Sequence, residues 1–304
     1  MSTRYEIGVK IGKGGGGSVY KAFDTQLQRD VAVKRLLSTD EASSEEVEAA
    51  AESLFKEAHA LSSLSHPNIV TVHDVDKDKK GGFVVMELLR GETLGATIEQ
   101  NVLMQEDFIE LVSQTMDALM AAHATHIMHR DLKPANFMVI WQASGRFQIK
   151  VLDFGLAKFS AAPSVQTIGQ GDSVLGSVDF MAPEQFERRE LDERTDLYAM
   201  GCVYYYTLAG LYPFRGKTAA QVMAAHLEHR VYSLEELRPD LAPSICQWVM
   251  WMINHDMNKR PESAKIAMEY FPLRPESPKD YKLKEKSKLK TSPRSLTDRT
   301  PIGL

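Results

Sequence analysis

The hydrophobic pattern of the chain changes near residue 90, and this change constrains the fold more than any other feature of the sequence. Before it, apolar and β-branched residues form short runs between turn residues, which predicts strands over residues 5–12, 18–25, 29–37, 68–75 and 82–89. After it, apolar residues recur at three- and four-residue intervals, which predicts helices over residues 94–100, 106–126, 193–211, 218–228 and 244–257. A small strand-rich lobe followed by a larger helix-rich lobe predicts an α+β fold with a cleft between the lobes.

One helix is also expected within the strand-rich lobe. Over residues 44–65 the apolar positions have helical spacing, and Pro67 follows and would end the helix. Three acids, Glu48, Glu52 and Glu57, lie on this segment.

Composition narrows the class of protein. The 304 residues are 43% hydrophobic and 25% charged, as in an average globular protein, which excludes global disorder and a disulfide scaffold. A formal net charge of −5 gives no reason to expect nucleic-acid binding. The two cysteines lack a paired metal-binding spacing, and no apolar run suggests a signal peptide or a membrane span. We therefore expect a soluble, cytoplasmic protein.

Two motifs in the strand-rich lobe suggest a phosphate site, although each is weak alone. Residues 12–19 fit the pattern G-x-G-x-x-G-x-V, and the sequence continues as a strand, so the glycines are expected in a hairpin. Glycines there let backbone N–H groups approach phosphate oxygens. The second motif is Val31-Ala32-Val33-Lys34, a strand with one lysine that we expect to face a solvent-filled cleft.

A third block of motif residues identifies the family that the sequence resembles. His129-Arg130-Asp131-Leu132-Lys133-Pro134-Ala135-Asn136 is followed, seventeen residues after its Asn, by Asp153-Phe154-Gly155 and later by Ala182-Pro183-Glu184. With the two earlier motifs, five patterns occur in one order. Over about residues 5–270 the chain therefore resembles the eukaryotic-type serine/threonine protein kinases. The sequences of its motifs are most similar to those of the bacterial members.

The resemblance implies a two-lobed kinase domain over residues 1–272, with an N-terminal lobe of about residues 5–88 and a C-terminal lobe of residues 89–272. It implies ATP and Mg²⁺ as cofactors and a protein hydroxyl as substrate. Asp131 would orient or deprotonate that hydroxyl, Lys133 would neutralise the transferring phosphoryl group, and Lys34 would bind the α- and β-phosphates. Lys34 would pair with a helix carboxylate, for which Glu57 fits the family pattern best.

The remaining implied roles concern the nucleotide and its metal. Asn136 and Asp153 would hold Mg²⁺, which prefers oxygen ligands. The residues expected around the nucleotide are Ile11, Gly12, Gly14, Gly17, Val19, Ala32, Lys34, Met86, Glu87, Leu89 and Met138. Met86 would close the rear of the pocket, while Glu87 and Leu89 would offer backbone hydrogen bonds to the adenine edge.

Further residues would support the site from behind. Leu61, Val72, His129 and Phe154 would form an apolar column linking the helix, the metal loop and the catalytic loop. Asp196 would brace the catalytic loop, and Glu184 would pair with Arg260. Ser177 would hydrogen-bond the Asp131 and Lys133 side chains, and phosphorylation of Thr167 or Ser173 would order the preceding loop.

Three alternatives remain open on the sequence alone. A pseudokinase scaffold would usually lack one of the Lys, Asp or Asn residues that are all present here. A small-molecule kinase would share the fold, but the Ala-Pro-Glu triplet and the Ser177 segment favour a protein substrate. His123, His126 and His129 have a spacing that could suggest zinc, but His129 already belongs to the catalytic loop and no fourth ligand is near.

The last residues differ in composition from the rest. Residues 273–304 carry nine Lys/Arg and four Asp/Glu and only one aromatic residue, Tyr281. Such a segment buries too little apolar surface to offset its chain entropy, so we expect a disordered tail. A solvated linker is the favoured interpretation, and contact with an anionic surface is the alternative.

Overall fold

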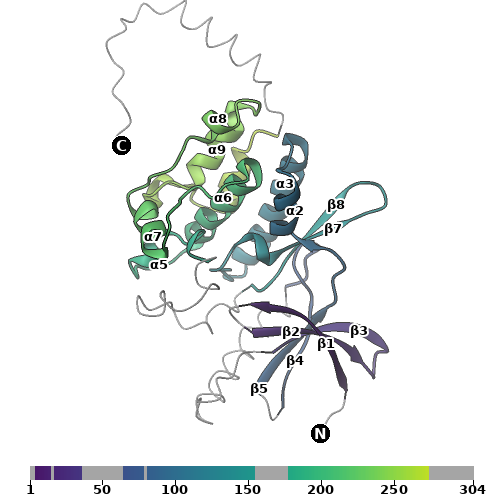
Figure 1. Cartoon of the computed structure of the whole chain (residues 1–304). Helices are drawn as coiled ribbons and strands as arrows, with labels where there is room; N and C mark the ends of the chain where they lie inside the picture. Colours follow the sequence, from purple (N-terminus) through teal and green to yellow (C-terminus); the bar gives the residue numbers. More distant parts are fainter. Residues whose placement is uncertain (1–3, 15–16, 36–63, 79–80, 155–176, 274–304) are drawn as a thin grey trace, which may run out of the picture.

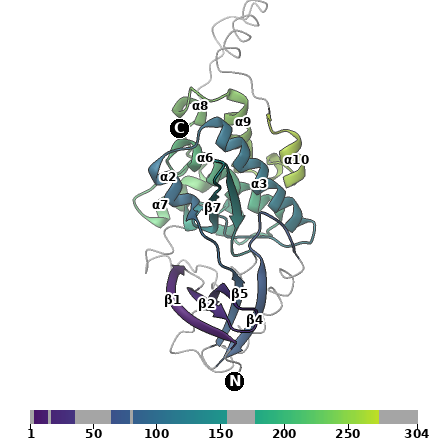
Figure 2. The same ribbon diagram turned by 90° about the vertical axis from the view of Figure 1, so that its right-hand side faces the viewer.

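The computed structural model describes residues 4–14, 17–35, 64–78, 81–154 and 177–273, and these form two lobes of different architecture (Figure 1). The N-terminal lobe is an antiparallel sheet with strand order β1-β2-β3-β5-β4. Its strands are β1 (Tyr5–Gly14), β2 (Gly17–Asp24), β3 (Arg29–Arg35), β4 (Val72–Asp78) and β5 (Gly81–Glu87). Figures 1 and 2 show this sheet at one end of the molecule and the helices at the other. The predicted α+β fold with two lobes is confirmed.

The register of the sheet gathers the predicted nucleotide-binding side chains on one face. Directly opposed residues of antiparallel strands share a face, as do residues two apart on one strand. Val19 pairs with Lys34, and Ala32 pairs with Met86. Because Ala32 and Lys34 are two apart on β3, all four side chains project from the same side of the sheet.

A second, smaller sheet lies where the two lobes meet. It has the order β6-β7-β8 and consists of β6 (Glu92–Thr93), β7 (Phe137–Trp141) and β8 (Phe147–Val151). The chain just before β4 is bound to it, because Val70 N donates to Val151 O at 2.9 Å and Val151 N donates to Asn68 O at 2.8 Å. Strand β8 is therefore attached to the N-terminal lobe on one side and to β7 on the other.

The C-terminal lobe is built around α6 (Glu193–Ala209), which is buried along nearly its whole length. The Asp192 side chain caps its first turn by accepting from Arg194 N, and Gly210 ends it with a φ of 67°, a conformation that favours glycine. The other helices are α2 (Leu94–Gln100), α3 (Gln105–His123), α5 (Pro183–Phe186), α7 (Ala219–Leu227), α8 (Leu234–Leu237), α9 (Pro243–Met252) and α10 (Ala264–Glu269), with short 3-10 turns η1 (Pro134–Asn136) and η4 (Met257–Lys259).

One hydrophobic core runs through both lobes. It contains Ala32, Val84 and Met86 of the sheet together with helical residues such as Leu119 and Tyr204. Ala32, Val84 and Met86 of the sheet are thus packed into the same cluster as the helices of the second lobe.

Several predicted boundaries differ from the structure. The chain from Asn68 to Val70 was expected in a strand of the main sheet, but it pairs with β8, and β4 begins only at Val72. The helix expected over residues 106–126 ends at His123, and the one expected over residues 244–257 ends at Met252. Helices α5, α8 and α10 are too short to give a sequence pattern.

The helix expected over residues 44–65 lies almost entirely outside the described residues, and its last two positions, Leu64 and Ser65, are not helical. Glu48, Glu52, Glu57 and Leu61 therefore remain without a structural account. No helix within the described ranges is long and apolar enough to cross a membrane.

Candidate active site

The catalytic loop that follows α3 is held by one buried carboxylate. Asp196, near the start of α6, accepts from His129 N and Arg130 N, each at 2.8 Å, and lies 3.0 Å from His123 Nε2. Burial alone would raise the pKa of Asp196, but the hydrogen bond from His123 and the other polar contacts hold it below its ordinary value. Asp196 is therefore ionised and fixes the loop, including Arg130 at a φ of 66°, as the sequence predicted.

Asp131, the predicted base, lies within a group of three polar side chains. Lys133 Nζ is 2.8 Å from Asp131 Oδ2 and also donates to Ser177 Oγ at 2.8 Å. The Asn136 side-chain amide donates to the backbone carbonyl of Asp131 at 2.7 Å. Asp131 remains about one-third exposed, so a hydroxyl could reach it. One lysine thus joins the catalytic loop to the segment that begins at Ser177.

A second charged pair lies across the cleft. Lys34 Nζ on β3 is 2.7 Å from Asp153 Oδ2, just after β8. The Lys34 side chain is only 9% exposed, so the expectation that it faces a solvent-filled cleft is wrong. Asp153 has a φ of 59°, a strained conformation for this residue. Glu57, the predicted partner of Lys34, lies outside the described residues.

Asp153 is positioned by its neighbours in the chain. Leu152 N donates to Asn136 O at 2.8 Å, and Leu152 O accepts from His129 Nε2 at 2.7 Å. The rings of Phe154 and His129 lie 4.8 Å apart. These contacts hold the segment after β8, which includes Asp153, against the catalytic loop. Asp153 therefore follows directly on a residue that is hydrogen-bonded to Asn136.

The predicted metal ligands have suitable chemistry for Mg²⁺. Asn136 offers an amide oxygen once its nitrogen has donated to Asp131, and Asp153 offers a carboxylate. Both are hard oxygen donors on adjoining segments, so the residues present fit the ion. No group of three or more His, Cys, Asp or Glu residues that could bind a metal occurs among the described residues.

Two of the three histidines with zinc-like spacing have other side-chain partners in the structure. His123 contacts Asp196, and His129 contacts Leu152 O. His126, at a φ of 59°, belongs to the turn after α3.

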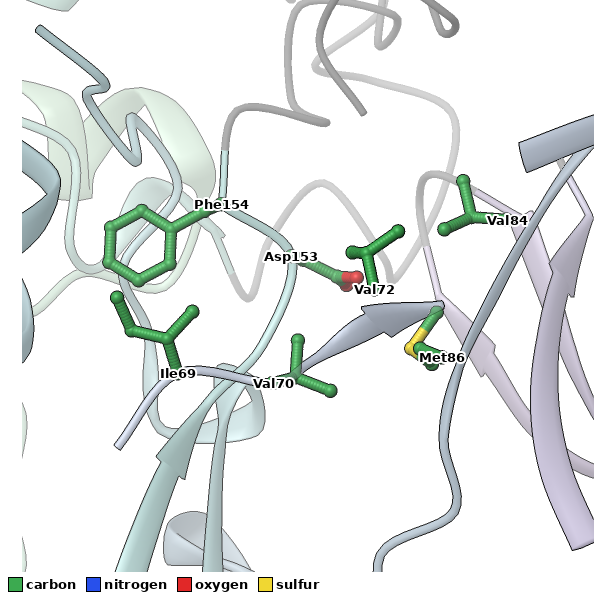
Figure 3. A pocket seen from close by; sticks show the side chains of 7 residues that line it. All are labelled: Ile69, Val70, Val72, Val84, Met86, Asp153 and Phe154. Atoms are coloured by element: carbon green, nitrogen blue, oxygen red, sulfur yellow. The ribbon is translucent and has the colours of Figure 1, made fainter. Parts of the chain in front are cut away.

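A pocket is lined by residues of both lobes, Met86 among them (Figure 3). Its lining is apolar except for the Asp153 carboxylate, which Figure 3 shows directed toward Val72. The lining residues are Ile69, Val70, Val72, Val84, Met86, Asp153 and Phe154. Met86 lines this pocket, but its role at the rear of the nucleotide site stays a prediction. Val72 and Phe154 meet in the same pocket, in agreement with the predicted apolar column.

The other predicted nucleotide contacts lie on the strands of the two sheets and just after β5. Ala32 and Met86 are buried, whereas Ile11 on β1 is 51% exposed. Gly12 pairs with Val19 and Gly14 with Gly17 in the β1–β2 hairpin, where Gly17 has a φ of 147° that favours glycine. Glu87 and Leu89 lie at the end of β5 and just after it, and Met138 lies on β7. The roles of these residues stay predictions.

A buried ion pair supports the large lobe beneath the site. Arg260 donates to Glu184 at 2.7 and 3.0 Å, both side chains are fully buried, and Thr195 Oγ1 donates to Glu184 at 2.9 Å. Burial by itself would raise the pKa of Glu184, but the hydrogen bonds and charge of Arg260 lower it. The predicted Glu184–Arg260 pair is confirmed.

Sequence reasoning missed one charged residue close to the site. Lys150 on β8 is buried, and its Nζ lies 2.6 Å from Glu87 Oε1. No local signal marks its burial, because Gln148 and Lys150 alternate with apolar residues along β8, the pattern of a strand with one exposed face.

Comparison with known proteins places this site in a family. The family model for the protein kinase domain matches residues 5–271. The chain belongs to the protein kinase family. Among curated kinases, it is 35% identical over 262 residues to the probable serine/threonine-protein kinase PknB of Lactococcus lactis, covering 86% of this chain and 40% of the relative. It is also 35% identical over 266 residues to the serine/threonine-protein kinase PrkC of Bacillus subtilis, covering 87% and 39%.

A solved kinase structure shows the same fold. The crystal structure of Rad53 residues 1–466 in complex with AMP-PNP matches with a TM-score of 0.71 at 25% identity, covering 89% of this chain and 65% of the Rad53 chain. The α+β architecture described above is therefore the protein kinase fold. This kinase chain spans about 40% of the length of the first curated relatives.

Proposed function

We propose that this chain is a serine/threonine protein kinase that transfers the γ-phosphoryl group of ATP to hydroxyl groups of proteins, its own included. The observation that carries the proposal is the arrangement of two charged pairs: Lys133 with Asp131 on the catalytic loop, and Lys34 with Asp153 across the cleft. The names of the bacterial relatives and the AMP-PNP complex of Rad53 support the activity and the nucleotide.

In this proposal, the residues of the chain supply position and charge. Asp131 is held by a backbone loop that Asp196 fixes, so its carboxylate can accept a hydrogen bond from the substrate hydroxyl and take up its proton. Lys133 is already next to Asp131, and its positive charge stabilises the oxygens of the transferring phosphoryl group. Lys34 would exchange part of its contact with Asp153 for phosphate oxygens of the nucleotide.

Mg²⁺ would be held by Asn136 and Asp153, where it would neutralise phosphate charge. Mg²⁺ binding would also give Asp153 a second cation besides Lys34. The 2.7 Å contact between Lys34 Nζ and Asp153 Oδ2 supports this arrangement, because a carboxylate that lies beside the predicted phosphate-binding lysine could also bind a cation attached to the same phosphates.

A protein rather than a small molecule is the proposed acceptor because the segment after Ser177 is anchored as a platform. Ser177 is tied to the catalytic loop through Lys133, and Val178 is buried against Ala219 and Val222 of α7. A peptide chain needs such a fixed surface next to the base to present its hydroxyl. A pseudokinase would not be expected to keep every charged group of the site.

Transfer of labelled γ-phosphate to a generic basic protein, in the presence of Mg²⁺, tests this function. We expect transfer by the wild type and a rate at least about 100-fold lower for Asp131→Asn, the scale commonly lost with a general base. Asp107→Asn, on the exposed surface of α3, is the matched control and should keep the wild-type rate. Nucleotide binding without transfer would indicate a pseudokinase, and transfer only to small molecules would contradict the proposed substrate.

A further inference from the structure

Lys150 is a buried lysine on β8, and polar groups around it compensate its charge. Its Nζ lies 2.6 Å from Glu87 Oε1 and donates to the Ile69 carbonyl at 3.2 Å. The side chain is only 10% exposed. A lysine at this depth is costly unless its charge is paired, and here Glu87 supplies the pairing charge.

Glu87, the partner, is held from a second direction. The same Oε1 atom accepts from Thr71 N at 2.8 Å, and Glu87 N donates to Thr71 O at 3.0 Å. Burial would raise the pKa of Glu87, but the hydrogen bonds from Lys150 and Thr71 outweigh it and lower the pKa. Both the backbone and the side chain of Glu87 are thus fixed, and its carboxylate is ionised.

The position of the pair relates it to the nucleotide. Glu87 is the last residue of β5, where the chain leaves the sheet for the second lobe. Lys150 is directly paired with Met138 across β7 and β8, so both side chains project from the same face of that sheet. Three residues after Lys150 comes Asp153, which contacts Lys34. The pair therefore connects the chain segment beside the predicted adenine edge to the strand that carries the predicted metal ligand.

We propose that Lys150 and Glu87 form a positioning pair that sets the affinity of the site for the adenine nucleotide. By binding Glu87 and the Ile69 carbonyl together, Lys150 holds the end of β5 at a fixed separation from β8. The backbone groups of residues 87–89 are then in place before the nucleotide binds. Nucleotide binding therefore loses less free energy to the ordering of this segment. This inference rests on the proposed ATP site, but it concerns affinity rather than transfer.

Calorimetric titration of the full chain with AMP-PNP and Mg²⁺ tests the pair. We expect Lys150→Met and Glu87→Gln each to weaken binding by about five- to tenfold, the effect of losing one hydrogen-bonded charge contact. Because the two residues act as one unit, the double variant should bind within about twofold of the weaker single variant. Lys150→Arg, which keeps the charge, should restore binding to within about threefold of the wild type.

Kinetics separate a positioning role from a merely structural one. In the transfer assay, the KM for ATP should rise in parallel with the dissociation constant while kcat changes by less than about twofold. Lys259→Met is the matched control, because Lys259 lies 4.0 Å from Asp256 on the surface of the large lobe with a side chain that is 72% exposed. It should bind AMP-PNP like the wild type.

Three results would overturn the inference. Unchanged AMP-PNP affinity in both single variants, whatever their melting temperatures, would make the pair structural only. Losses that multiply in the double variant would show that the residues act independently, and absence of AMP-PNP binding by the wild type would remove the site itself. If Lys150→Met does not fold, Glu87→Gln and Lys150→Arg decide the question. A wild type that binds AMP-PNP but transfers no phosphate would contradict the proposed function alone.

Discussion

At the scale of single residues, the site is dominated by two pairs of opposite charges. The Lys34 ammonium and the Asp153 carboxylate are 2.7 Å apart, and the Lys133 ammonium and the Asp131 carboxylate are 2.8 Å apart. Each pair combines a group that would bind phosphate with a group that would bind a metal ion or a hydroxyl. The cleft is thus prepared for a highly charged substrate, because each cation is held in place by an anion that has a role of its own.

Replacing Lys34 tests the first of these pairs. We expect Lys34→Met to keep less than about a tenth of wild-type phosphate transfer, because the α- and β-phosphates lose their cation. The melting temperature should stay close to that of the wild type, since Met matches the length of the lysine stem and Asp153 remains partly exposed. Transfer rates and thermal unfolding measure the two effects. A variant with near-normal transfer would show that Lys34 does not bind phosphate.

Asp179, two residues after Ser177, gives a prediction about pH. Burial raises the pKa of Asp179 to about 6, well above the usual range for an aspartate. Between about pH 4 and 6 the folded state then binds a proton that the unfolded state has lost, so the contribution of Asp179 to stability falls as the pH rises through this window. Above it, Asp179 carries a half-buried charge that opposes folding.

Asp179→Asn should therefore be more stable than the wild type at pH 7.5, by about 1 kcal/mol after allowance for solvent screening. The gain should shrink toward zero as the pH falls to about 4. Urea unfolding of both proteins across this range measures the difference. Parallel stability profiles from pH 4 to 7.5 would contradict the raised pKa.

At the scale of elements, the close contact between α6 and α9 depends on a glycine. A Cβ atom at Gly201 would lie 2.7 Å from Ile253 Cγ2 and 2.8 Å from Met252 Cβ. These distances are shorter than side chains tolerate, so the two helices can approach only because position 201 has no side chain. The same helix carries Asp196, so its placement also fixes the catalytic loop.

Gly201→Ala should lower the free energy of unfolding by about 1–2 kcal/mol, because the steric cost exceeds the gain in helix propensity. Gly95→Ala is the matched control. It lies in α2, where an added Cβ would meet Pro134 Cβ at an ordinary 3.6 Å, and it should leave stability unchanged or raise it by up to about 1 kcal/mol. Denaturant unfolding of both variants measures this. Equal effects of the two substitutions would contradict the close packing of α6 on α9.

Helices could be predicted from the sequence more accurately than the pairing of strands. The positions of α2 and of the start of α6 were predicted correctly, because capping residues and apolar spacing are local signals. The pairing of Asn68–Val70 with β8 was not predicted, because strand pairing joins residues that are distant in sequence. The Lys150–Glu87 contact was missed for the same reason: 63 positions separate its two residues, and only the sheet register brings them together.

More of the candidate site than of the fold could be predicted from the sequence. Asp131, Lys133 and Asn136 lie in one contiguous block, so their mutual contacts follow from local structure. The burial of Lys34 was misjudged, because the exposure of a side chain depends on contacts with residues distant in sequence, such as Asp153. A sequence motif predicts which residue types form a site. The burial of those residues and their ion-pair partners depend on tertiary packing between segments that are distant in sequence.

At the scale of the whole molecule, the two lobes share one hydrophobic core and are further joined by the contacts of β8. The cleft walls are thus parts of one folded unit that ends near Leu273 in the described residues. The composition of residues 273–304 predicts that this segment adds nothing to the core.

Truncation after Pro272 tests that expectation. The shortened chain should melt within about 2 °C of the full chain and should keep its transfer rate, because few apolar contacts are removed. Thermal unfolding and the phosphate-transfer assay on both chains provide the comparison. A loss of several degrees, or of activity, would show that the tail docks on the kinase domain.

The central claim is that Asp131 and the groups around it transfer phosphate to serine and threonine hydroxyls. The most direct measurement is a phosphosite map by mass spectrometry. The full chain is first dephosphorylated and then incubated with ATP, Mg²⁺ and a generic basic protein, in parallel with the Asp131→Asn variant. The account predicts phosphoserine and phosphothreonine in the wild-type reaction, with Thr167 or Ser173 among the sites on the chain itself, and none above background for Asp131→Asn. Equal phosphorylation by both proteins, phosphate confined to tyrosine, or no phosphate at all would contradict it.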